Sequence, residues 1–396
     1  MGIWYTFYMS YRPSRNILLL GLTSFFNDLS SEMILSIFPA FFISVLKAGA
    51  GSLGFIEGLA DGASNIIKIY AGKLSDRTQK RRPLIISGYA LSVCVRPFYT
   101  LVGTVAGVAG LRFTDRIGKG LREGPRDAVI SLSTSREETG RAFGFHRMLD
   151  TLGAIVGPLI AYLILRAYPD GFHIVFLAAF VLGICAVFTV LFVTEAVGAV
   201  QRKDISLSSF ALFSSEFKRY LLALLFLSFG SIPVAVLLLK TQNIGLTLAS
   251  IPLFYLLYNV TYAGFSYGAG KLSDKHGHKK IIIIGYLLLV LGYIFLARAE
   301  HTIPLAISFC ILGLFPALTD GVQRAFASTL SGKGERGSAL GYVNAVSGVG
   351  LLCAGIVGGY VWQVFGVNVA LWLAGILALF GLGVLATVNP ARSLDA

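Results

Sequence analysis

Long apolar runs follow one another along the whole chain, separated by short charged or glycine- and proline-containing breaks. Each run is long enough for a membrane-spanning helix, which needs about 20 apolar residues. The first six predicted helices cover residues 17–46, 51–74, 83–101, 104–131, 141–166 and 172–194. The second six cover residues 219–240, 247–271, 280–297, 303–330, 338–362 and 367–388. The pattern predicts an all-α polytopic membrane protein with twelve transmembrane helices.

An internal repeat divides these helices into two groups. Gly72-Lys-Leu-Ser-Asp-Arg77 recurs as Gly270-Lys-Leu-Ser-Asp-Lys275, and Arg126 recurs as Arg324 at the same offset. Two copies of a six-helix unit, each crossing the membrane an even number of times, must be parallel repeats. We therefore expect an N-terminal bundle at residues 1–194, a cytoplasmic linker at 195–218 and a C-terminal bundle at 219–396.

Composition supports a membrane protein, and charge gives its orientation. Hydrophobic residues make up 55% of the chain and charged residues only 13%, whereas soluble proteins carry about 25% charged residues. The net charge of +13 is concentrated in loops on one predicted side of the membrane. The loops on the opposite side hold only Lys47, Arg166, Lys240 and Arg298. Because positive loops stay inside, we expect both termini in the cytoplasm and no nucleic-acid partner.

Several absences narrow the expectations further. The four cysteines are scattered through apolar segments without a CxxC spacing, so we expect no disulfide, no metal site and no cofactor. The first 15 residues lack a small-residue cleavage site and are predicted to be an uncleaved start. We expect a monomer in the cell inner membrane, with the lipid bilayer, protons and a small-molecule substrate as its partners.

Three motifs resemble those of the major facilitator superfamily. The segment Gly72 to Arg82 resembles its loop signature, with Gln79 replacing the second glycine, and the second copy keeps that glycine at Gly277. Arg116-Ile-Gly-Lys-Gly120 resembles its fourth-helix element. The spacing of its fifth-helix antiporter motif is matched by Gly144, Gly153, Gly157 and Pro158, although Ala161 and Tyr162 replace the final glycine pair.

This resemblance implies a central cavity lined mainly by the first, fourth, seventh and tenth helices. It also implies alternating access, in which the two halves rock about the substrate. Residues 27–32 and 115–126 are similar to segments of a bacterial subgroup that includes siderophore transporters.

Ionisable residues inside the predicted spans are the candidates for chemistry, because each is costly in a membrane unless it is paired or hydrated. Nine are basic: Lys68, Arg96, Arg112, Arg116, Lys119, Arg122, Arg126, Arg147 and Arg324. Nine are acidic: Asp28, Glu32, Glu57, Asp61, Asp115, Glu123, Asp127, Asp150 and Asp320. Only Arg324 and Asp320 lie in the second half, so the two halves share a fold but differ in function.

The fourth predicted helix carries a single charged stripe from Arg112 to Arg126, which must face protein or water. We predict substrate binding by Arg112, Arg116, Lys119 and Asp320, and proton coupling by Asp28, Glu32, Asp61, Asp115 and Asp150. Asp28 and Glu32 form an i, i+4 pair without a basic residue in their span, which makes them the first choice for the proton. The alternatives are that the basic residues are counter-ions, or that the charges form buried ion pairs that only hold the bundle together.

Two further groups have structural interpretations. Asp76, Arg77 and Asp274 in the repeated signature, with Arg126 and Arg324, are predicted to form a cytoplasmic gate of ion pairs; the alternative is positive-inside anchoring alone. Gly144, Gly153 and Gly157 are predicted to permit close helix packing, and Pro158 to bend its helix. Tyr255, Tyr258 and Tyr262 share one helix face and are expected to serve packing rather than ligand stacking.

The function that these observations favour is proton-coupled carriage of a small polar, zwitterionic or carboxylate-bearing organic solute. A multidrug/proton antiporter is the alternative, although the dense charge inside the spans argues against greasy cationic substrates. A non-transporting membrane sensor is a third hypothesis, which the lack of a soluble signalling domain disfavours. An enzyme is not expected, because no nucleophile, base and orienting group cluster together.

Overall fold

The computed structural model describes residues 13–135, 138–196, 210, 213–331 and 336–389, and the regular elements among these residues are helices. The first half contains α2 (Arg15–Ser44), α3 (Ala50–Thr78), α4 (Arg81–Cys94), η1 (Arg96–Thr100), α5 (Val105–Leu132), α6 (Thr139–Ala167) and α7 (Phe172–Val190). The second half contains α9 (Ser215–Phe229), α10 (Val234–Leu237), η2 (Leu238–Ile244), η3 (Leu248–Ser250), α11 (Ile251–His276), α12 (His278–Arg298), α13 (Thr302–Thr329), α14 (Arg336–Phe365) and α15 (Val367–Thr387).

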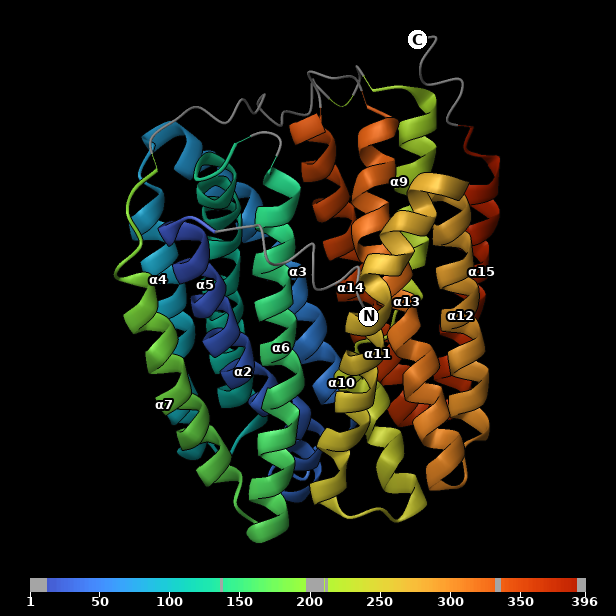
Figure 1. Ribbon diagram of the computed structural model, residues 1–396. Coiled ribbons are helices and arrows are strands. Elements are labelled where there is room, and N and C mark those ends of the chain that lie inside the picture. The colour runs from blue at the N-terminus through green and yellow to red at the C-terminus, as the bar shows by residue number, and fades with distance from the viewer. Residues whose placement is uncertain (1–12, 136–137, 197–209, 211–212, 332–335, 390–396) are drawn as a thin grey trace, which may run out of the picture.

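The helices of each half stand side by side, as Figure 1 shows, with α4 and α7 on the outer flank of one half and α12 and α15 on that of the other. The contacts between the halves run mainly through α3 with α14 and through α6 with α11. The prediction of an all-α fold is confirmed for the described residues, and the helix bounds fall close to the predicted apolar runs.

Eight of the described helical segments are long and apolar enough to cross a membrane by themselves. These are the six segments of the second half together with α6 and α7. The remaining helices of the first half either carry ionisable residues near their middles, as α2, α3 and α5 do, or are short, as α4 is. The chain is therefore a multi-pass membrane protein, while the count of twelve spans stays a prediction.

Two predicted spans are interrupted, each for a local reason. The seventh breaks between α9 and α10, where α9 ends at Phe229 and Pro233 precedes the start of a new helix. Tyr293 of α12 satisfies both loose ends, since its hydroxyl donates to the Gly230 carbonyl at 2.9 Å and accepts the Ile232 N–H at 2.9 Å. The third span ends in the 3-10 turn η1, which contains Pro97. Broken backbone inside a membrane bundle is tolerated where the protein supplies such partners.

The two halves approach most closely where α3 crosses α14. A Cβ atom added at Gly54 would lie 2.3 Å from the Gly355 carbonyl oxygen, and one added at Gly359 would lie 2.6 Å from the Ala50 carbonyl oxygen. Only glycine permits such contact between helix backbones. Gln363 extends the contact, because its side-chain oxygen accepts the Gly51 N–H at 2.9 Å. This end of the molecule is closed.

The halves separate toward the opposite end, which carries the α3–α4 and α11–α12 turns. Asn259 of α11 still donates to the Ala154 carbonyl of α6 at 2.9 Å. About two to three turns from Ala154 toward the start of α6, Arg147 is exposed and a Cβ atom at Gly144 would meet nothing within 4 Å. Asp320 and Arg324 of α13 are exposed as well. The space between the halves therefore opens toward the α3–α4 and α11–α12 turns, which we call the open face.

The placement of these two turns leads to a topological prediction. In a variant without its four native cysteines, single cysteines introduced at Gln79 and at His278 should react with an impermeant thiol reagent from the cytoplasmic side only. The reason is that the two turns lie at one end of the bundle, separated by an even number of helical segments (Figure 1). A cysteine at Asp170, in the turn between α6 and α7 at the other end, is the control and should react from outside only. Labelling of the first two cysteines from opposite sides would contradict the arrangement.

Candidate functional site

The charged stripe of α5 faces α3, and its first arginine is fully engaged there. Arg112 forms a two-pronged ion pair with Glu57, with Nε to Oε1 and Nη2 to Oε2 both at 2.8 Å, and each side chain is only 3% exposed. Asp115 lies 3.4 Å from the same guanidinium, which also stands over the Phe38 ring. The Arg112 guanidinium is therefore enclosed by protein groups in this arrangement, and its predicted role in substrate binding stays a prediction.

The pairing loosens along α5. Arg116 lies 3.9 Å from Glu57 and 3.5 Å from Asp61, so the structure places Asp61 beside an arginine. Lys119 lies 3.9 Å from Glu123, whose closer partner is Lys68 at 2.7 Å. The Lys119 side chain is 40% exposed. Among the basic residues predicted to meet the substrate, Lys119 is thus the most accessible and Arg112 the least.

Two buried arginines of the first half are held by neutral groups. Arg96 of η1 donates from Nη2 to the Asn27 side-chain oxygen at 2.8 Å and from Nη1 to the Ser30 hydroxyl. Arg122 donates to the Ser92 hydroxyl at 2.7 Å and stands over the Tyr89 ring at 4.6 Å. These contacts join η1 to α2 and α4 to α5. The two arginines therefore hold helices together, which is one of the alternatives that the sequence left open for charges inside the spans.

A pair of carboxyl groups from different helices forms the second feature of the site. Asp28 of α2 and Asp150 of α6 lie within hydrogen-bonding reach of each other. The other oxygen contacts of Asp150 come from the Ser24 hydroxyl at 2.5 Å and from Arg147 Nη1 at 2.9 Å. Asn27 donates to Asp28 at 3.1 Å. Two carboxyl groups can share a hydrogen bond only when one of them holds a proton.

Other ionisable groups on α2, α5 and α6 act on the charge of this carboxyl pair. They are Glu32 on α2, Lys119 and Arg126 on α5, and His146 and Arg147 on α6. Glu32, predicted to be the partner of Asp28, instead accepts a hydrogen bond from Tyr255 of α11 at 2.5 Å. The acidic partner that Asp28 contacts directly therefore lies on α6 rather than one turn along its own helix.

A hydrogen-bonded chain leads from this pair into the second half. Arg147, which holds Asp150, also donates to the Tyr262 hydroxyl of α11 and lies 5.5 Å from its ring. The Tyr262 hydroxyl in turn donates to Asp320 of α13 at 2.8 Å. We call Asp28, Asp150, Arg147, Tyr262 and Asp320 the bridging chain. It is one of the places where ionisable groups of the two halves meet in the described residues, and the bond of Tyr255 to Glu32 is another.

The tyrosines of α11 serve as contacts between the halves, a role that the sequence did not indicate. Tyr255 bonds Glu32, Tyr262 bonds Asp320 and Arg147, and Tyr258 stacks on Tyr255 with ring centres 6.0 Å apart. The 255, 259, 262 spacing places one helix face toward the first half. That spacing was visible in the sequence, but the carboxylates and the arginine that the tyrosines contact lie on other helices.

The predicted gate residues stand at the open face and are not joined across it. Arg126 lies 3.0 Å from Asp127, and Asp76 lies 3.8 Å from Arg81. Within the described residues no ion pair joins Asp274 to Arg324. Arg77 lies in the last turn of α3. The predicted pairs of Asp76 with Arg126 and of Asp274 with Arg324 are thus not formed in this arrangement, in which the two halves are separated at the open face.

The small residues of α6 divide into two groups. Cβ atoms added at Gly153 and Gly157 would lie 2.4 Å and 2.5 Å from the Phe25 and Leu29 carbonyl oxygens of α2, and Pro158 is buried beside them. Gly144 meets nothing within 4 Å, because this end of α6 borders the opening between the halves. The close packing predicted for Gly144 is therefore absent from this arrangement.

Comparisons with known proteins agree with this architecture. The family model described as Major Facilitator Superfamily matches residues 20–239 and 220–395. An uncharacterised MFS-type transporter of Methanocaldococcus jannaschii is 33% identical and covers 93% of this chain and 95% of its own. The multidrug resistance protein MdtG of a Rahnella strain is 24% identical over 93% of this chain and 92% of its own. The crystal structure of the nucleoside transporter NupG has a TM-score of 0.80, covering 94% of this chain and 99% of that one at 14% identity, which is a likeness of fold alone.

The pairing in α5 predicts a sharp difference in stability between two variants. Glu57→Gln leaves the buried Arg112 with only the more distant Asp115, and removal of one partner from a buried pair costs about 3–5 kcal/mol. Lys119→Gln removes a half-exposed charge and should cost less than about 1 kcal/mol. Thermal unfolding of the purified variants in detergent measures both. Equal, small shifts in melting temperature would show that the Arg112–Glu57 pair does not hold the first half together.

Proposed function

Because the chain belongs to the major facilitator superfamily, a family of membrane transporters and not of enzymes, we propose that it carries a small polar organic solute across the inner membrane with coupling to protons. The observation that carries this proposal is the carboxyl pair of Asp28 and Asp150 at the start of the bridging chain. The proposal holds for import and export alike, because one shared proton site can serve symport or antiport.

The proton is best placed on the carboxyl pair. Two adjacent carboxyl groups in a site of low dielectric constant do not both ionise readily, so the pair binds and releases one proton as a unit. Asp61 and Asp115 already have arginine counter-ions, Arg116 and Arg112 respectively. Glu32 stays a secondary candidate, since it lies one turn from Asp28 and binds Tyr255. We therefore place the proton on the Asp28–Asp150 pair, whereas the sequence favoured Asp28 with Glu32.

Arg147 gives a physical route from proton to conformation. Its guanidinium contacts Asp150 on one side and Tyr262 on the other. Loss of the shared proton would leave two carboxylates beside each other, and their combined charge would draw Arg147 away from Tyr262. The hydrogen bond between the halves would then weaken. Proton binding and contact between the halves would thus depend on one side chain.

The solute is proposed to carry both signs of charge or a carboxylate. On the first half, Lys119 is accessible and Arg116 is partly so, while Asp320 and Arg324 are exposed on the second half. A zwitterion could satisfy a cation on one half and Asp320 on the other. Carboxylate-bearing siderophores are one class of this kind. The likeness to a multidrug resistance protein supports the alternative of a multidrug/proton antiporter.

Orientation and gating complete the proposal. The excess of Lys and Arg at the open face favours a cytoplasmic location for it, so that the structure would be inward-facing and both termini cytoplasmic. When the open face closes, Asp76 and Asp274 would come to pair with basic residues such as Arg126 and Arg324. In the present arrangement Asp76 lies near Arg81 and Arg126 lies near Asp127, and each of these pairs is within the first half.

The test uses purified protein in proteoliposomes with an imposed pH gradient and a panel of amino acids, polycarboxylates, a hydroxamate siderophore and a cationic dye. One proton coupled per solute, across one pH unit, supports about tenfold accumulation, because both correspond to about 1.4 kcal/mol. Asp28→Asn and Asp150→Asn each mimic the protonated pair. They should retain binding and exchange of the transported solute while accumulation against a gradient falls to equilibrium.

The control is Asp170→Asn, which removes an exposed acid in the α6–α7 turn and should accumulate solute as the wild type does. Normal accumulation by both single variants and by the double variant would overturn the proton site. Transport of the dye alone would favour the multidrug alternative, and binding without any transport would favour the sensor.

A further inference from the structure

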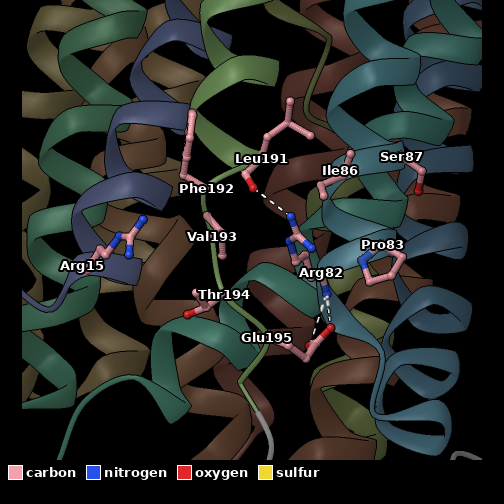
Figure 2. Close-up of a pocket in the computed structure, with 10 residues that line it drawn as sticks. All are labelled: Arg15, Arg82, Pro83, Ile86, Ser87, Leu191, Phe192, Val193, Thr194 and Glu195. Carbon is pink, nitrogen blue, oxygen red and sulfur yellow. Dashed lines mark hydrogen bonds between the residues drawn. The ribbon is translucent and has the colours of Figure 1, made fainter.

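A groove lies on the outer flank of the first half, away from the bridging chain (Figure 2). It is bounded by the start of α2, the first turns of α4 and the segment 191–195 that follows α7, and its volume is about 780 Å³. The segment 191–195 leaves the helical path predicted for it, since α7 ends at Val190. The groove exists because this segment runs past α4 instead of continuing the helix.

Two guanidinium groups stand on facing sides of the groove. Figure 2 shows Arg15 on one side of Val193 and Arg82 on the other. Arg82 uses one donor for the Leu191 carbonyl at 2.8 Å, which leaves its other side-chain donors available. Arg15 is exposed, and within the described residues its side chain has no hydrogen bond or ion pair. The first turn of α2 contains no acidic residue that would offset this charge.

The acidic residue of the groove is already engaged. The Glu195 carboxylate accepts the backbone N–H of Arg81 at 2.9 Å and that of Arg82 at 3.0 Å, so that it caps the start of α4. This position matches the preference of carboxylates for helix N-termini. The negative charge of Glu195 is thus held at the helix end, and the two guanidinium groups remain as the sites for an external anion.

The remaining walls are apolar and continuous with the outer surface. Pro83, Ile86 and Val193 line the groove, and Leu191 and Phe192 are 45% and 47% exposed. A soluble anion would gain nothing from such a surface, whereas an amphiphile would cover it. Basic pockets beside transmembrane helices on the cytoplasmic side bind lipid head groups for this reason, and guanidinium matches the geometry of a phosphate.

We propose that this groove binds one anionic phospholipid of the phosphatidylglycerol class. Its phosphate would lie between Arg15 and Arg82, and its acyl chains would follow Leu191 and Phe192. The inference rests on the membrane placement given above under the proposed function, but it concerns a different surface of the molecule and needs neither a substrate nor a proton.

Native mass spectrometry of the detergent-solubilised protein with added phosphatidylglycerol tests the proposal. Each basic residue near an anionic surface contributes about 1 kcal/mol, or about fivefold in affinity. Arg15→Gln should therefore bind the most tightly retained lipid about fivefold more weakly, and the Arg15→Gln/Arg82→Gln double variant more weakly still. Phosphatidylcholine, which carries no net charge, should show no such difference between wild type and variants.

The matched control is Arg166→Gln, which removes an exposed arginine at the other end of α6 and should leave retention unchanged. Arg15→Gln decides the outcome if the double variant does not fold, because within the described part of the chain the Arg15 side chain has no hydrogen bond or ion pair to lose. Equal retention of phosphatidylglycerol by wild type and Arg15→Gln would overturn the proposal. So would displacement of the lipid by millimolar inorganic phosphate alone, since that would identify a site for soluble anions. A failure of the proton-coupling experiments would leave these results unaffected.

Discussion

A charge buried in a membrane bundle must be paired or hydrated, and this constraint sorts the ionisable residues of the first half into two sets. One set is internally neutralised, with Arg112 clasped by Glu57 at the centre and Lys68 paired with Glu123 beside it. It joins α3 to α5 and has little surface to offer a ligand. The other set lies where the halves meet, and two of its members, Glu32 and Arg147, contact tyrosines of the second half. The first set builds the scaffold from which the second can act.

The second set is unusual because its contacts are shared. Arg147 bonds an acid on its own helix and a tyrosine on the opposite half, and that tyrosine bonds Asp320. We propose that a change of charge at one end of the bridging chain alters the contact between the halves. At the closed end the halves meet through the glycine contacts of α3 with α14 and through the hydrogen bond from the Gly51 N–H to the Gln363 side chain.

The sequence predicted the helices and the charged face of α5, because apolar runs and helical periodicity are local properties. It did not predict which groups meet. Asp28 and Glu32 are one turn apart on α2, which suggested a pair, but Asp28 meets Asp150 and Glu32 meets Tyr255. These partners lie on helices far away in the sequence, and a single sequence does not show which distant helices pack against each other. The same holds for Arg112, whose charge was visible in the sequence whereas its enclosure by Glu57 was not.

The central claim is that one proton on the Asp28–Asp150 pair controls the contact between the halves. The most direct measurement is the distance, by pulsed electron paramagnetic resonance, between spin labels at Gln79 and His278 on the open face, recorded from low to high pH. In the wild type, low pH should favour the long distance of the present arrangement and high pH should add a population with a shorter one. In Asp28→Asn, which keeps the pair permanently neutral on one side, the long distance should persist at every pH. An equal pH response in wild type and Asp28→Asn would contradict the account.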